Sequence, residues 1–192
     1  MLQVYEWVRF FLAHQDTNDA KSYGVQVEHV PNALYRVIGV HHLTPVENAG
    51  LSHVWLMVLD ASGKPLRGIP VAWDWIGRHP DQAAVPIALD KPDPEPMGNI
   101  PMGKGQTVSA WVQGAGTSDV VSGLSTTHPD EGPGNTLYHH SFLVVWQEGA
   151  RQIVLPGFEE LLVSVDYEIR LAQDAIGNAR SLIAARRAAG NE

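Results

Sequence analysis

Histidine is the residue whose number and spacing first point to chemistry in this chain. The chain has nine histidines and no cysteine, so imidazole nitrogens would supply most ligands of any transition-metal site. Two adjacent pairs stand out, His41-His42 and His139-His140. Neighbouring side chains on a strand point to opposite faces, so each pair offers one ligand at most to a single site. The weak candidates for a metal site are therefore His42, His128 and His140.

The spacing of these residues does not match a metal or catalytic motif. The sequence contains no HExxH, no HxH and no GxSxG elbow, and histidines satisfied inside the fold explain the pairs better. The carboxylates Asp90, Asp93 and Glu95 lack the DxDxDG spacing of a calcium loop. We therefore predict no cofactor and no enzymatic activity. A metal-dependent enzyme that uses the histidine pairs is the third of three hypotheses.

The six tryptophans point to ligand binding, because aromatic rings on a sheet face can stack on sugar rings. Most of them are expected in the core, including Trp73, Trp111 and Trp146. Trp75 stands where a long proline-containing segment begins, and it is the best candidate for exposure. The sequence therefore predicts a glycan site formed by Trp75, Arg78, His79 and Asp81.

Composition and charge limit the classes of partner. The chain has 192 residues, of which 44% are hydrophobic and 18% charged, as expected of a globular protein. A net charge of −8 excludes a nucleic-acid partner, because phosphate binding needs a basic face. No apolar run approaches the roughly 20 residues that span a bilayer. The N-terminus lacks a basic leader, so no signal peptide is expected and the chain is predicted to be made as a soluble cytosolic protein.

The elements that must position these residues are predicted to be mainly β. Apolar, β-branched segments at 54–59 and 69–75 flank the turn-forming segment 60–68 and predict a hairpin. Further strands are expected at 25–30, 34–40, 84–89, 107–112 and 139–146. Segment 114–134 is polar and is interpreted as a loop. Residues 33–148 are therefore predicted to form a β-sandwich domain, either immunoglobulin-like or jelly-roll.

Two terminal segments are expected to be helical. Residues 1–32 are predicted to hold a short helix or arm and a linker, because Val4, Trp7, Val8, Phe11 and Leu12 follow helical spacing. Residues 157–189 contain no proline and are predicted to form a long C-terminal helix. Its heptad positions are Leu162, Val165, Ile169, Ala172, Ile176, Ala179 and Ile183. This stripe predicts self-association; the alternative is a helix that packs on its own sandwich.

Residues 34–146 resemble an immunoglobulin-like or carbohydrate-binding-module-like β-sandwich of the kind found in phage virion proteins and as an accessory of cell-wall hydrolases. The stretches that carry the resemblance are IGVHHLTPVEN (38–48), LDASG (59–63), GIPVAW (68–73), SDVVSGL (118–124) and HHSF (139–142). The resemblance implies no catalytic residue. It implies a structural subunit of a virion or surface assembly that associates with its own copies or with other structural subunits. The alternative is a glycan- or cell-wall-binding accessory module.

Overall fold

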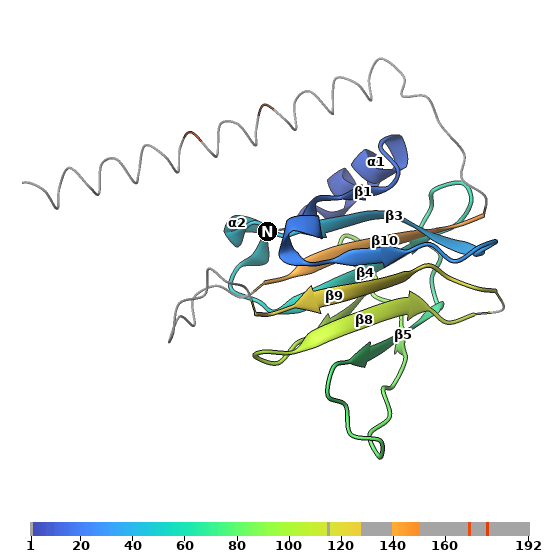
Figure 1. The fold of residues 1–192 in the computed structure, drawn as a ribbon. Helices are drawn as coiled ribbons and strands as arrows, with labels where there is room; N and C mark the ends of the chain where they lie inside the picture. Colours follow the sequence, from blue (N-terminus) through green and yellow to red (C-terminus); the bar gives the residue numbers. More distant parts are fainter. Residues whose placement is uncertain (1, 115, 128–139, 150–168, 170–175, 177–192) are drawn as a thin grey trace, which may run out of the picture. The chain divides into compact units, whose positions relative to one another are not determined.

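The structure, a computed structural model, describes residues 2–114, 116–127, 140–149, 169 and 176. The chain divides into two units, Met1–Ile153 and Val154–Glu192. The first unit is mainly β and contains two sheets of five strands each, which form the two layers seen in Figure 1. The predicted β-sandwich architecture is confirmed.

The first sheet is mixed. In spatial order it contains β1 (Thr17–Asn18), β3 (Tyr35–His42), β10 (Phe142–Glu148), β4 (His53–Leu59) and β7 (Gly98–Pro101). Strand β10 runs antiparallel to β3 and parallel to β4. Most residues of β3 and β10 are buried, because helix α1 (Val4–Ala13) contacts both strands from outside the sandwich. Strands covered on both faces need apolar side chains on both.

The second sheet is entirely antiparallel. In spatial order it contains β2 (Gln26–Glu28), β9 (Val120–Ser125), β8 (Thr107–Val112), β5 (Pro70–Trp75) and β6 (Ile87–Ala88). The largest side chains of the core come from both sheets and include Trp146, Phe142, Leu56, Met57 and Leu124. Burial of this apolar surface between the two layers is the main force that stabilises the fold.

The N-terminal helix forms as predicted. Its buried residues are Val4, Trp7, Val8 and Phe11, four of the five that the helical spacing selected. The ring of Phe11 packs directly on Gly39 of β3, where a Cβ atom would lie 2.1 Å from the ring. Glycine at this position therefore lets the helix approach the sheet. Two further short helices follow, η1 (Asp19–Tyr23) and α2 (Pro45–Asn48).

Two details of the predicted strand arrangement are wrong. Strands β4 and β5 do not form a hairpin, because β4 lies in the first sheet and β5 in the second. After the turn, the Leu66 N–H still donates to the Val58 carbonyl, and only then does the chain cross between the layers. The segment interpreted as a polar loop at 114–134 contains β9.

The predicted C-terminal helix over 157–189 lies outside the described residues except at two positions. Ile169 and Ile176 are both helical, with 48% and 52% of their surface exposed. The other heptad positions, Leu162, Val165, Ala172, Ala179 and Ile183, lie outside. Among the helices that the structure describes, none combines the length and apolar character required to cross a membrane.

Candidate binding site

The candidate site lies at the end of β5, where two tryptophan side chains are partly exposed to solvent. Strand β6 pairs only with Pro70 and Val71 of β5, so the second half of β5 extends past it. Val71 is fully buried, whereas Trp73 and Trp75, two and four residues further along the same face, are partly exposed. Their ring centroids lie 5.0 Å apart with 31° between the planes.

The loop after β5 holds this tryptophan pair in place. The indole Nε1 of Trp73 donates to the Val85 carbonyl at 3.0 Å, which ties the far end of the loop back to the strand. Ile76 and Val85 expose 80% and 73% of their surface. Two exposed apolar residues thus lie next to the rings along the chain or through the Trp73–Val85 hydrogen bond, and exposed apolar surface of this kind marks interaction sites.

A charged pair borders the rings. Arg78 Nε donates to Asp74 Oδ1 at 2.6 Å, and the guanidinium carbon lies 5.9 Å from the Trp75 ring centroid, within the range of a cation–π contact. The hydrogen bond from Arg78, assisted by the Trp75 backbone N–H, lowers the pKa of Asp74. Both groups therefore stay ionised at neutral pH. Asp74 alternates with Trp73 and Trp75 and belongs to the other face of β5, so Arg78 is the member of the pair that contacts the aromatic surface. We call Trp73, Asp74, Trp75 and Arg78 the β5 aromatic patch.

The structure brings the predicted glycan residues together in part. Trp75 and Arg78 contact each other, and His79 pairs with Asp81 at 3.3 Å, with side chains 67% and 89% exposed. Trp73 and Asp74 are not among the predicted site residues, since the sequence predicts Trp73 in the core with most of the tryptophans. Its spacing of two residues from Trp75, which puts both rings on one face, is the signal that could have extended the site to Trp73.

Two of the metal candidates contact each other directly. His42 Nε2 and His140 Nδ1 are 2.8 Å apart, and the Tyr23 ring stacks on His42 with centroids 3.8 Å apart. A nitrogen–nitrogen hydrogen bond of this length occupies the lone pair and the hydrogen that metal binding would have to replace. His128 lies outside the described residues. Within the described ranges, no group of three or more histidine and carboxylate side chains could hold a metal ion.

The remaining member of the first pair, His41, is 3% exposed and fully engaged in the fold. Its Nδ1 lies 2.6 Å from Asp19 Oδ2 and its Nε2 lies 3.1 Å from Glu47 Oε2. The Trp7 ring stacks on it at 3.5 Å between centroids. His41 therefore serves as a structural histidine that joins α1, η1 and α2 to β3.

No family model, curated protein or solved structure matches this chain. Among the residues that the structure describes, the β5 aromatic patch is the exposed feature best suited to a ligand.

Proposed function

We propose that this chain is a non-enzymatic binding module that recognises carbohydrate through the β5 aromatic patch. The observation that carries the proposal is the pair of partly exposed tryptophan rings, 5.0 Å apart on one face of β5, with the Arg78 guanidinium 5.9 Å from the Trp75 ring and held there by its ion pair with Asp74. Sugar rings have apolar C–H faces and a polar rim. Tryptophan rings stack on the apolar C–H faces of a sugar, and charged hydrogen-bonding groups bind its polar rim.

The rigidity of the patch adds support. Trp73 is held by its bond to Val85, and Asp74 accepts from both Arg78 and the Trp75 backbone N–H, at 2.6 and 2.8 Å. Groups that are already ordered lose less conformational entropy when a ligand binds. The resemblance of residues 34–146 to accessory sandwich modules, immunoglobulin-like or carbohydrate-binding-module-like, agrees with a binding role at a cell wall, cell surface or virion.

Replacing Trp75 with alanine should weaken glycan binding about tenfold or more, because one stacking surface is lost. The full chain is screened on a glycan array, and the affinity for a retained glycan is then measured by titration calorimetry. Trp111→Ala is the matched control, since Trp111 is also partly exposed but pairs with Ala72 and so lies on the opposite face of the sheet.

Retention of no glycan by the wild-type chain would overturn the carbohydrate proposal. Equal losses in the Trp75→Ala and Trp111→Ala variants would also overturn it, because binding would then not depend on the β5 aromatic patch.

A second role, assembly into a multi-copy virion or surface structure, is favoured by a separate observation. Ile169 and Ile176 are helical and about half exposed, and their spacing of seven residues places both on one side of a helix. Exposed isoleucines at this spacing form the seam between helices in coiled coils. We propose that this seam joins copies of the chain.

The double variant Ile169→Asp/Ile176→Asp should lower the mass of the particle in solution, because buried carboxylates at an apolar seam are unfavourable. Light scattering measures the mass of wild type and variant at matched concentration. Val46→Asp, at a position 80% exposed on α2, controls for added charge and should leave the mass unchanged. A monomeric wild-type chain, or equal masses for wild type and double variant, would exclude assembly through this seam.

A further inference from the structure

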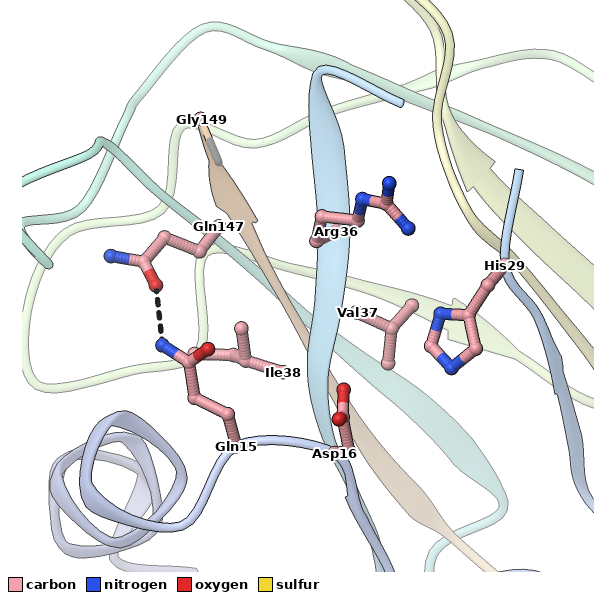
Figure 2. A pocket seen from close by; sticks show the side chains of 8 residues that line it. All are labelled: Gln15, Asp16, His29, Arg36, Val37, Ile38, Gln147 and Gly149. Atoms are coloured by element: carbon pink, nitrogen blue, oxygen red, sulfur yellow. Dashed lines mark hydrogen bonds between the residues drawn. The ribbon is translucent and has the colours of Figure 1, made fainter. Parts of the chain in front are cut away.

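A polar cavity beside β3 has no role in the functions proposed above. It has a volume of about 190 Å³, and its polar lining comes from Gln15, Asp16, His29, Arg36 and Gln147. Figure 2 shows Arg36 and His29 on one side of β3, Gln15 and Gln147 on the other, and Asp16 below Val37. A larger cavity of about 560 Å³ shares Asp16, His29 and Val37 with it.

A fully buried carboxylate positions the cationic side of this cavity. Asp119 is 0% exposed and accepts hydrogen bonds from the backbone N–H groups of Val30 and Val37, at 3.0 and 3.1 Å. His29 Nδ1 lies 2.9 Å from its Oδ2. Because a carboxylate oxygen accepts, His29 Nδ1 carries the hydrogen of this bond, and Nε2 is the ring nitrogen that Asp119 does not engage.

Arg36 is held in a different way. Its Nη1 lies 3.7 Å from Asp119 Oδ1, which is an ion-pair distance and too long for a hydrogen bond. The buried carboxylate therefore attracts the guanidinium without accepting a hydrogen bond from its N–H donors. The Arg36 side chain keeps 32% of its surface exposed, so these donors remain available on the cavity wall.

The lining of the cavity includes charges of both signs. Arg36 supplies a cation with a planar donor fork, the geometry that matches a carboxylate. Asp16 supplies a carboxylate below Val37 in Figure 2, and Gln15 Nε2 donates to Gln147 Oε1 at 3.4 Å on the other side of β3 from Arg36. A molecule with one carboxylate and nearby donors would match both the Arg36 cation and the Asp16 carboxylate.

We propose that this cavity binds a small molecule that carries one carboxylate and adjacent hydroxyl or ammonium groups. Arg36 binds the carboxylate, His29 Nε2 and Asp16 accept from the donor groups, and Asp119 positions the first two side chains. Sugar acids and amino acids share this chemistry, and the volume admits one unit of either kind. The site is separate from the β5 aromatic patch and does not depend on it.

The test is a titration of the full chain, followed by ¹H–¹⁵N NMR, with D-glucuronate and with L-alanine as probes. Glucose and L-alaninamide are the matched probes that lack the carboxylate. At least one acid should shift the amide signals of Val37 and Gly149, which line the cavity, with a Kd in the millimolar range or tighter. Glucuronate alone would identify a sugar acid, and alanine alone an amino acid.

Arg36→Gln should weaken the binding of the effective acid about tenfold or more, because the charge-assisted hydrogen bonds are lost. Arg36→Lys keeps the charge and the fold but loses the fork, and should weaken binding several-fold. Arg9→Gln, at an exposed position of α1, is the control and should bind like wild type. The proposal is overturned if neither acid shifts the lining amides, if the carboxylate-free probes bind equally well, or if both Arg36 variants bind like wild type.

Discussion

Replacement of Asp119 with alanine is expected to lower the free energy of unfolding by about 3–5 kcal/mol, the range found when a buried ion pair loses one partner. The substitution leaves the backbone N–H groups of Val30 and Val37 without their acceptor, and each unsatisfied buried donor costs about 1–3 kcal/mol. It also leaves Arg36 without its counter-charge and His29 Nδ1 without its acceptor. This side chain connects the approach to β9 in one sheet with β3 in the other, so its loss should weaken both layers together.

Urea unfolding followed by tryptophan fluorescence measures this effect. Asp119→Asn keeps one carbonyl oxygen and should lose less stability than Asp119→Ala. Asp81→Ala is the matched control, because the Asp81 side chain is 89% exposed and substitutions of this kind stay within about 0.5 kcal/mol. If Asp119→Ala proves as stable as Asp81→Ala, the buried carboxylate does not hold the sheets together.

The sequence predicts those strands whose side chains follow a simple pattern. Strands β3, β4, β5, β8 and β10 are rich in β-branched and aromatic residues. The predicted bounds of the first four lie within two residues of the observed ones, whereas the predicted start of β10 is three residues too early. Strand β9 was missed because its pattern is irregular. Gly123 has φ +76°, and the pairing with β8 shifts register between Val108 and Ala110. A bulge of this kind breaks the alternation on which strand prediction depends.

The residues of the two binding sites differ in how far the sequence alone can predict them. The loop after Trp75 could be found locally, because an aromatic side chain and three polar neighbours fall within seven residues. The exposure of Trp73 could not be predicted from the sequence, because it depends on how far β6 extends along β5. The cavity beside β3 is harder still to predict from the sequence. Asp16, His29 and Arg36 belong to separate segments, and only the packing of β1, β2 and β3 brings them to one wall.

The largest pH effect is expected from His41 and the residues that surround it. Two carboxylates, Asp19 and Glu47, approach its two ring nitrogens. Carboxylates only accept hydrogen bonds, so both nitrogens must carry hydrogen and the ring is an imidazolium. The Trp7 ring stacks on this cation at 3.5 Å, and its Nε1 donates to Glu47 Oε1 at 2.9 Å. We call these four side chains the His41 cluster.

The pKa values in the His41 cluster shift in opposite directions. Burial alone would lower the pKa of His41, but the hydrogen bonds and charges of Asp19 and Glu47 raise it above its ordinary 6.5. Burial alone would raise the pKa of Glu47, but His41, Trp7 and the Thr44 backbone lower it from 4.5 to about 2. The His41 contribution to stability is therefore complete below pH 6.5 and is lost as the pH rises through the folded-state pKa. The Glu47 contribution is complete above pH 4.5 and is lost as the pH falls towards 2.

The variant Glu47→Gln should therefore be least stable relative to wild type between about pH 4.5 and 6.5. The shift of the Glu47 pKa corresponds to a loss on the order of 3 kcal/mol in that window. The difference should shrink on both sides, as Glu47 gains a proton at low pH and His41 loses one at high pH. Urea unfolding of both proteins from pH 3 to 9 measures it.

His79→Gln is the control for this experiment, because the His79 side chain is 67% exposed and its removal should leave the shape of the stability curve unchanged. A wild-type minus Glu47→Gln difference that stays constant across the whole pH range would show that His41 is neutral in the folded chain. The buried imidazolium would then not be what holds α1, η1 and α2 on β3. A stability difference that is largest between about pH 4.5 and 6.5 would show that the protonated His41 ring holds α1, η1 and α2 on β3.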